Sequence, residues 1–203
     1  MIVAGAGGHA LELLDILIAN GMTDNLVFFD EFTEAKFFQD KYPILSIDAE
    51  VAAYFKSDSQ FILGTGNPMV RFSFYQRFLA LGGKHRAIKG VGVVNSPSAK
   101  NIDSDIFNLC FIAANTQIGR GTLINTGAQI HHDVIIGEFA EITPRAVLLG
   151  ASQVGDFSSI GANATILPEV KIGKRAIVGA GSVVTQDVPD GVTVVEVPGR
   201  III

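Results

Sequence analysis

The sequence of 203 residues contains one cysteine, Cys110, and no tryptophan. A single cysteine excludes an internal disulfide framework and a cysteine-based zinc site, and it is typical of a reducing compartment. No apolar run reaches the ~18–20 residues of a membrane span. The N-terminal stretch lacks a basic segment and meets glycine too early for a signal peptide. These absences predict a cytoplasmic protein without membrane insertion.

Charged residues are few, and acidic ones outnumber basic ones. The chain has 15 Lys and Arg against 20 Asp and Glu, a formal net charge of −5, and a pI near 5.3. Excess negative charge argues against a nucleic-acid partner bound through neutralised phosphates. Because 48% of the residues are apolar and only 17% are charged, the chain is able to bury a sizeable core.

Aromatic residues are almost missing from the second half of the chain. Thirteen of the 17 Phe and Tyr precede residue 90, and four follow it. This shift predicts two cores of different width, and hence two domains, 1–90 and 91–203. Gly, Asn, Ser and Pro cluster at 90–98, where we place the boundary.

Residues 1–90 alternate short apolar segments with helical periods. We expect strands at 2–4, 26–29 and 61–63, and helices at 11–21, 48–55 and 68–80. Leu11, Leu14 and Ile18 give the period of the first helix. Alternating strands and helices predict a parallel sheet that binds ligands beyond the carboxyl ends of its strands.

Residues 91–203 contain a period of six. Every sixth residue from Ile106 to Val184 is Ile, Leu or Val, at 14 positions, and no residue four places later is large. Such a run has a chance of about 10⁻⁸ if a quarter of residues are of these types. Each hexad predicts a short strand and a corner, three strands close a coil, and coils stack ~4.8 Å apart. The repeat alone is also compatible with a purely structural solenoid.

The hexads, the Gly-rich start and the stretch 125–133 (Asn-Thr-Gly-Ala-Gln-Ile-His-His-Asp) resemble the bacterial nucleotide-sugar and sialic acid acetyltransferases. That family includes the N-acetyltransferase of bacillosamine synthesis and the sialic acid O-acetyltransferases. The resemblance spans nearly the whole chain. It implies an N-terminal half-Rossmann βαβ domain, a left-handed parallel β-helix, a homotrimer, and acetyl-coenzyme A (acetyl-CoA) bound between neighbouring β-helices.

His132 is the candidate catalytic residue. It comes two positions after the inward Ile130, so it is expected to point outward, beside Asp133. A carboxylate that holds one imidazole N–H leaves the other nitrogen able to accept a proton. The resemblance implies that this pair acts as general base. Eighteen residues further lies Gly150, on the same face one coil up, whose amide is a candidate for binding the thioester oxyanion.

Two residues depart from the family pattern. His131 stands where the family commonly has Glu, and Glu141 stands where some members place a second His near the acetyl group. These departures leave open a different acyl group or a lost activity.

The resemblance also implies a coenzyme site along the later coils, without a metal. Its candidates are Glu141, Gly150, Gly161, Gly179, Ala180 and Lys174, with Arg175 as a second phosphate partner. The tail 197–200 (Val-Pro-Gly-Arg) matches the closing V-P-x-[KR] segment, expected near the nucleotide end of the coenzyme.

The N-terminal loop allows two interpretations. Gly5-x-Gly7-x-x-Ala10 follows a strand and opens a helix, with Asp30 about 20 residues later, which fits a dinucleotide fingerprint and a reductase. A domain of ~90 residues is only half of that fold, so a mononucleotide half-site that holds a sugar-nucleotide diphosphate fits better. The loop supplies the candidates Gly5, Gly7, Gly8 and His9 for substrate binding. The resemblance implies further nucleotide contacts at the ends of the second and third strands, which here are Asp30, Glu31, Gly64 and Asn67.

The preferred hypothesis is an acetyltransferase that moves acetyl from acetyl-CoA to the amine of a nucleotide-activated amino sugar, with His132 as general base. O-acetylation of sialic acid or a related sugar is the close alternative. A non-catalytic structural trimer, a nucleotide-dependent reductase and transfer of another acyl group also stay open.

Overall fold

The computed structural model describes residues 1–202, which form two compact units. One unit comprises Met1–Gly66 and Val70–Ala87, and the other comprises Asn67–Met69 and the chain from Ile88 on. No helix within residues 1–202 has the length and apolar character needed to cross a membrane.

The first unit is built on a six-stranded sheet of order β3-β4-β2-β1-β5-β6. Its strands are β1 (Ile2–Ala4), β2 (Val27–Phe29), β3 (Phe37–Phe38), β4 (Tyr42–Leu45), β5 (Gln60–Leu63) and β6 (Lys84–His85). All neighbours pair in parallel except β3 and β4, which are antiparallel. The three strands expected from the sequence form the centre of the sheet. The sequence did not predict β3, β4 and β6 because such short segments carry no readable alternation.

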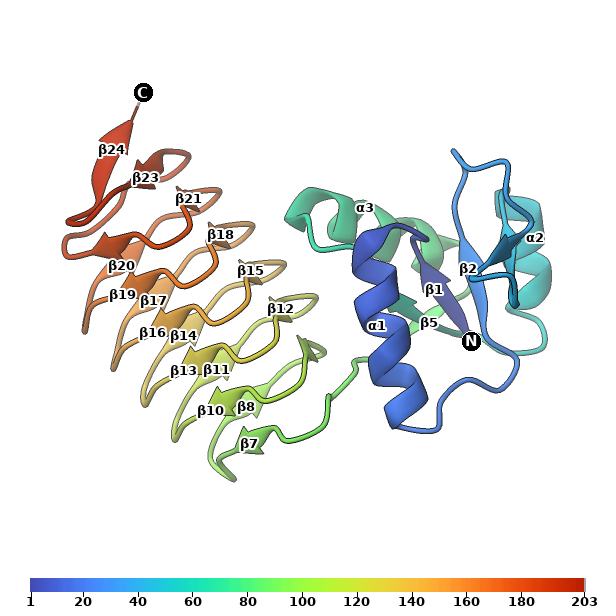
Figure 1. Cartoon of the computed structure of the whole chain (residues 1–203), viewed down its shortest axis with the longest axis horizontal. Helices are drawn as coiled ribbons and strands as arrows, with labels where there is room; N and C mark the ends of the chain where they lie inside the picture. Colours follow the sequence, from blue (N-terminus) through green and yellow to red (C-terminus); the bar gives the residue numbers. More distant parts are fainter. Residues whose placement is uncertain (203) are drawn as a thin grey trace. The chain divides into compact units, whose positions relative to one another are not determined.

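Three helices accompany this sheet: α1 (Gly8–Ala19), α2 (Asp48–Tyr54) and α3 (Pro68–Ala80) (Figure 1). The predicted apolar period of α1 is wrong in part, because Leu11 and Ile18 are 41% and 55% exposed. The buried side chains of α1 are Ala10, Leu13, Leu14, Ile16 and Leu17. Since α1 is apolar at most positions, periodicity alone could not select its buried face.

Phenylalanines fill the core of the first unit. The ring of Phe78 on α3 lies edge-on to Phe29 and to Phe61, with ring centroids 5.4 Å apart in both pairs. All three side chains are fully buried. The space between helix and sheet therefore explains why aromatic residues concentrate in this part of the chain.

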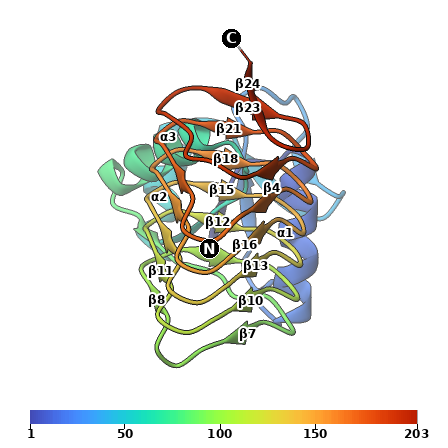
Figure 2. The same cartoon turned by 90° about the vertical axis from the view of Figure 1, so that its left-hand side faces the viewer.

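The second unit is a parallel β-helix of three sheets, and its coils stack along one axis from β7 to β24 (Figures 1 and 2). The first sheet contains β7 (Val94–Asn95), β10 (Phe111–Ile112), β13 (Gln129–Ile130), β16 (Val147–Leu148), β19 (Thr165–Ile166) and β22 (Val183–Val184). The second contains β8 (Lys100–Asn101), β11 (Gln117–Ile118), β14 (Ile135–Ile136), β17 (Gln153–Val154) and β20 (Lys171–Ile172). The third contains β9 (Asp105–Ile106), β12 (Leu123–Ile124), β15 (Glu141–Ile142), β18 (Ser159–Ile160), β21 (Ile177–Val178), β23 (Thr193–Val195) and β24 (Arg200–Ile202).

Three rows of turns join these sheets. The first corner, between the first and second sheets, contains 113–116, 131–134, 149–152 and 167–170. The second corner, between the second and third sheets, contains 119–122, 137–140, 155–158 and 173–176. The third corner leads back to the first sheet and contains 107–110, 125–128, 143–146, 161–164 and 179–182.

The predicted inward positions are confirmed. All 14 aliphatic residues of the hexad series are at most 3% exposed and join one core cluster. Equivalent residues of successive coils pair 18 residues apart, as Ile112 does with Ile130. Gly155 is required by this stacking, since a Cβ there would lie 2.6 Å from the backbone nitrogen of Lys174 in the next coil.

The solenoid begins two strands earlier than the hexads predict. β7 and β8 place Asn95 and Asn101 in the inward register, and the Asn101 Nδ2 donates to the Asn95 Oδ1 over 3.0 Å. Terminal repeats need a polar outer face, so these asparagines cap the core. The periodicity missed these two strands because their inward residues are polar. At the other end β24 pairs antiparallel with β23.

Candidate functional site

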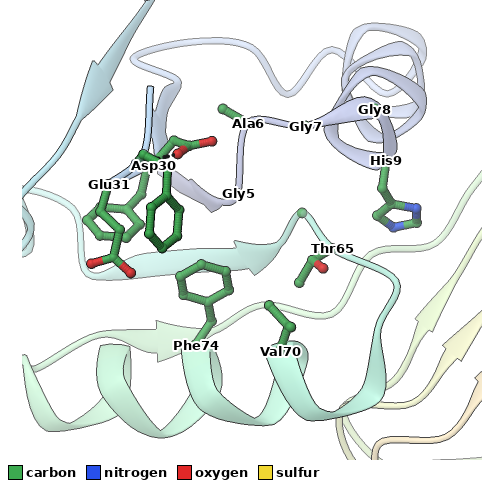
Figure 3. Close-up of a pocket in the computed structure, with 13 residues that line it drawn as sticks. Gly5, Ala6, Gly7, Gly8, His9, Asp30, Glu31, Thr65, Val70 and Phe74 are labelled. Atoms are coloured by element: carbon green, nitrogen blue, oxygen red, sulfur yellow. Dashed lines mark hydrogen bonds between the residues drawn. The ribbon is translucent and has the colours of Figure 1, made fainter. Parts of the chain in front are cut away.

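A pocket of about 350 Å³ opens at the carboxyl ends of β1, β2 and β5, the edge predicted for ligand binding (Figure 3). Its lining includes seven of the eight candidates for substrate binding: Gly5, Gly7, Gly8, His9, Asp30, Glu31 and Gly64. The structure thus brings together segments that follow three different strands. Asn67 is not among the lining residues, and its Oδ1 accepts a hydrogen bond from the Met69 N–H at the start of α3.

The glycines give this pocket an accessible backbone. A Cβ on Gly7 or Gly8 would meet no protein atom within 4 Å, so their surfaces are open. Gly7 precedes α1, where no side chain caps the helix and no acidic residue occupies the first turn. Free N–H groups and the helix dipole make such a terminus suitable for an anion such as a phosphate.

The two predicted carboxylates differ in their surroundings. Arg77 binds both oxygens of Glu31 at 3.1 Å and also donates to Asp48 over 2.7 Å. These contacts raise the pKa of Arg77, with the hydrogen bond to Glu31 as the largest cause. Among the described residues, Asp30 instead accepts a hydrogen bond only from the nearby Phe32 N–H, at 2.9 Å, through its Oδ1. The charge of Glu31 is therefore compensated by the protein, whereas Asp30 keeps an oxygen available for a ligand.

The sequence did not predict the apolar wall of the pocket. It is formed by Phe29, Phe32, Val70 and Phe74. Phe32 is 91% exposed, and Phe74 comes from α3, facing the strand ends (Figure 3). An exposed aromatic residue directly after an acidic strand end was the available signal for a ring-binding surface.

The second group of candidates lies at the first corner of the β-helix. His132 projects outward as predicted and is 67% exposed, and its Nδ1 lies 2.8 Å from the Asp133 Oδ2. The hydrogen bond from His132 is the largest of the causes that lower the pKa of Asp133. The carboxylate therefore stays ionised and is able to hold the Nδ1–H, which leaves Nε2 as the proton acceptor.

Gly150 lies against the His132 ring. A Cβ on Gly150 would come 2.5 Å from the Cε1 and 2.6 Å from the Nε2 of His132. The glycine therefore makes room for the imidazole. Its carbonyl accepts from the Glu169 N–H over 3.0 Å, while its own N–H donates to no other residue of the described chain. That amide is available to a ligand held beside Nε2.

His131 has different surroundings from His132. Its ring meets that of Phe111 edge-on, with centroids 5.8 Å apart, and it is half-buried. An imidazole packed on an aromatic ring of the first sheet does not share the carboxylate of Asp133. Of the two neighbouring histidines, therefore, only His132 is hydrogen-bonded to this carboxylate.

Comparisons with known proteins agree with this arrangement. The PglD N-terminal domain model matches residues 1–78, and the bacterial transferase hexapeptide model matches 110–150 and 151–186. The acetyltransferase domain of PglB from Neisseria gonorrhoeae, solved with acetyl-CoA, is 27% identical, with a TM-score of 0.91 over 99% of this chain and 98% of that chain. A histidine-to-asparagine mutant of perosamine N-acetyltransferase from Caulobacter crescentus, solved with CoA and GDP-perosamine, is 27% identical, with a TM-score of 0.91 over 99% and 95%. WeeI from Acinetobacter baumannii is 26% identical, with a TM-score of 0.84 over 99% and 98%.

The chain thus matches the PglD N-terminal domain and then the hexapeptide repeats, which confirms its resemblance to the bacterial hexapeptide-repeat sugar acetyltransferases. The predicted fold class, a half-Rossmann βαβ part followed by a left-handed β-helix, is confirmed. Among residues 1–202 of this acetyltransferase, no group of three or more His, Cys, Asp or Glu is arranged to hold a metal ion.

The coenzyme candidates of this acetyltransferase are spread around the β-helix. Gly161, Gly179 and Ala180 lie at the third corner, and Glu141 lies on β15 in the third sheet. Only Gly150 shares the first corner with His132. One chain therefore does not bring all these candidates together.

The structure gives a different explanation for the glycines at positions 161 and 179. A Cβ on Gly161 would lie 2.4 Å from the backbone nitrogen of Ala180 in the next coil, and a Cβ on Gly179 would lie 2.9 Å from a methyl carbon of Val195. Their missing side chains make room for the neighbouring coil, as at Gly155. The expectation that they leave space for a pantetheine arm therefore has no support in these contacts.

Lys174 lies at the second corner, whereas His132 lies at the first. Its Nζ is 2.9 Å from the Asp156 Oδ2, and this pairing raises the pKa of Lys174 and lowers that of Asp156. Arg175 places its guanidinium 5.8 Å from the ring centroid of Phe157. Both predicted phosphate partners thus have partners of their own within the corner.

Proposed function

We propose that this protein transfers an acetyl group from acetyl-CoA to the amino group of a nucleotide-linked amino sugar. The observation that carries the proposal is the His132–Asp133 pair, seated over Gly150 on an exposed corner of a family fold that binds acetyl-CoA in the PglB domain. Two relatives solved with GDP-perosamine are named as N-acetyltransferases, which favours an amine over the hydroxyl of a sialic acid.

His132 supplies the base. The acceptor nitrogen forms a bond to the thioester carbonyl carbon and loses a proton to Nε2 of His132. When the tetrahedral intermediate collapses, the carbon–sulfur bond breaks, and the imidazolium returns the proton to the CoA thiolate. Asp133 stabilises the imidazolium that forms between these steps.

Gly150 is the candidate group for the developing oxyanion. Its N–H has no acceptor in the described chain and adjoins the His132 ring. A preorganised backbone donor gains strength from negative charge that appears only in the transition state. We therefore assign to Gly150 both the space for the imidazole and a donor to the acetyl oxygen.

The pocket of the first unit is proposed to bind the nucleotide part of the acceptor. The open backbone of Gly7 and Gly8 at the start of α1 suits a diphosphate. The aromatic side chains of Phe32 and Phe74 offer an apolar wall for a ring, and Asp30 offers a hydrogen-bond acceptor. These three features match the three parts of a nucleoside diphosphate: the phosphates, the ring and its polar edge.

The coenzyme site is proposed to form between copies of the chain in a homotrimer. The first and third corners border the first sheet, whose outward residues include four apolar ones: Val94, Phe111, Val147 and Val183. Around a three-fold axis with these faces inward, the first corner of one copy meets the third corner of the next. His132 would then face Ala180 of the neighbouring copy across a shared groove.

A thioester-cleavage assay tests this function. Acetyl-CoA is supplied with a panel of nucleotide-linked amino sugars and free sialic acids, and release of the CoA thiol is measured with wild type and His132→Ala. We expect turnover only with nucleotide-linked amines and only with wild type. Turnover with free sialic acids alone would contradict the assigned acceptor, and equal turnover in His132→Ala would contradict the assigned base.

A further inference from the structure

Asp133 has a second partner besides His132. Asn115 lies 18 residues earlier, at the same position of the first corner in the preceding coil. Its Nδ2 donates to the Asp133 Oδ1 over 3.0 Å, while the Oδ2 is 2.8 Å from the His132 Nδ1. Each oxygen of this carboxylate therefore has its own partner.

This second hydrogen bond matters because the pair is exposed. The side chains of His132 and Asp133 are 67% and 51% accessible, and an exposed ion pair contributes little by itself since both side chains keep alternative rotamers. A donor on the Oδ1 limits rotation of the carboxylate. It thereby fixes the direction in which the Oδ2 holds the imidazole.

Asn115 is itself anchored in the stack of coils. Its backbone N–H donates to the Ser98 Oγ over 3.0 Å, and the Asp133 N–H donates to the carbonyl of Ala114 over 3.0 Å. Asn115 and Asp133 both have φ = 61°, in the left-handed region that Asn and Asp adopt more readily than most residues. Their amide and carboxylate therefore project from equivalent backbone positions. Asn115 is also the second cause, after His132, that lowers the pKa of Asp133.

We propose that Asn115 is a positioning residue for acetyl transfer, which orients the Asp133 carboxylate so that His132 presents its Nε2 to the acceptor amine. The inference rests on the proposed function, in which His132 is the base. Asn115 makes no assigned contact with either substrate and acts through Asp133.

Asn115→Ala removes the donor. The corner accepts alanine, because Ala151 occupies the same position one coil beyond Asp133 with φ = 57°. We expect kcat to fall by about tenfold, less than for loss of the base itself, with KM for both substrates within a factor of two. Asn115→Asp, which retains the shape but not the donor, should lower kcat at least as much. Gln117→Ala, on β11 of the same coil, is the matched control and should leave kcat unchanged.

Two further measurements separate positioning from a general structural effect. In an Asp133→Ala background, Asn115→Ala should cause no additional loss, because the two residues act in series. Nitrogen-15 NMR of His132 should show mainly the Nδ1–H tautomer in wild type and a mixture in Asn115→Ala.

The proposal would be overturned by an unchanged kcat in folded Asn115→Ala or by an unchanged tautomer of His132. It would also be overturned if the losses of kcat from Asn115→Ala and Asp133→Ala multiplied in the double variant. If wild type transfers acetyl to no acceptor, the proposed function fails, and the tautomer measurement still decides whether Asn115 orients the pair.

Discussion

At the scale of single residues, the first corner places two adjacent histidines in different surroundings. His132 shares a hydrogen bond with Asp133, whereas His131 packs on Phe111. A carboxylate partner sets the tautomer of an imidazole and stabilises its charged form, and a ring contact does neither. The structure therefore assigns proton transfer to His132 alone.

We expect His132→Ala to lower turnover by at least ~10²-fold with little change in coenzyme affinity, because a base acts only in the transition state. His131→Ala should cost less. Both variants are compared in one steady-state assay, with the oligomeric state checked for each. An inactive His131→Ala beside an active His132→Ala would reverse the assignment.

Gly150→Ala should reduce kcat by ~10-fold or more, because the new Cβ would take the place of the His132 ring and displace its Nε2. The comparison is Gly191→Ala near the C-terminal end of the β-helix, where a Cβ meets nothing within 4 Å and the positive φ of 71° is the source of strain. In a His132→Ala background the Gly150 substitution should have little further effect on the residual rate, because no imidazole ring remains to be displaced. A large additional loss there would assign the effect to the amide or the backbone.

The Asp133 carboxyl gives a pH-dependent prediction. Hydrogen bonds from His132 and then Asn115 hold its pKa below the usual range. A carboxyl whose pKa is lower in the folded chain stabilises the fold above its unfolded pKa, and this contribution is lost as pH falls through the folded value. The Tm difference between wild type and Asp133→Asn should therefore be present at neutral pH and shrink towards acid. A difference that grows on acidification would contradict the hydrogen-bonded pair.

At the scale of elements, glycines at the start of α1 and glycines of the coils serve different purposes. A Cβ at Gly7 meets open space, whereas a Cβ at Gly155 would meet the backbone of the next coil. The first kind of position is free for a ligand. The second is occupied by the protein itself.

Gly7→Val should leave the fold intact and weaken binding of a nucleotide sugar by tenfold or more, or about 1.4 kcal/mol, because the side chain blocks the approach to the backbone. Titration calorimetry with a nucleotide sugar and with CoA measures both affinities. Ala53→Val, exposed on α2 outside the pocket, is the control. Weaker CoA binding with unchanged acceptor binding would exchange the roles of the two units.

Gly155→Ala should lower the free energy of unfolding by about 1–3 kcal/mol, because its Cβ conflicts with backbone atoms that cannot move without shifting a coil. Gly150→Ala should cost less stability, since a side chain is able to rotate away. Denaturant titration of both variants tests the difference. A larger loss in Gly150→Ala would show that the corner is less adaptable than the coil stack.

At the scale of the whole molecule, the proposed coenzyme groove needs a second copy. Val147→Lys, on the outward face of the first sheet, should yield monomers by light scattering and abolish transfer, because charges at an apolar interface lack partners. Gln153→Lys, on the second sheet, is the control and should remain trimeric. Monomeric wild type at micromolar concentration would contradict both the trimer and the shared site.

The sequence alone determined the β-helix and the outward direction of His132. Each coil repeats one backbone geometry, so the period of six decides which side chains enter the core, and a step of 18 decides which residues stack, as His132 and Gly150 do. The strand ends of the first unit were likewise predictable, because Gly-rich loops and acidic residues follow buried strands.

Only the tertiary structure decided what lies next to each of these groups. Periodicity places Gly150 and Gly161 equally on a surface, but one lies under an imidazole and the other under the next coil. The step of 18 also stacks Asn115 on Asp133, but their hydrogen bond is seen only in the structure. The Arg77–Glu31 ion pair joins residues 46 positions apart, which no period in the sequence relates. Such contacts depend on side-chain direction and on the space between neighbouring segments, and the pattern along one chain contains neither.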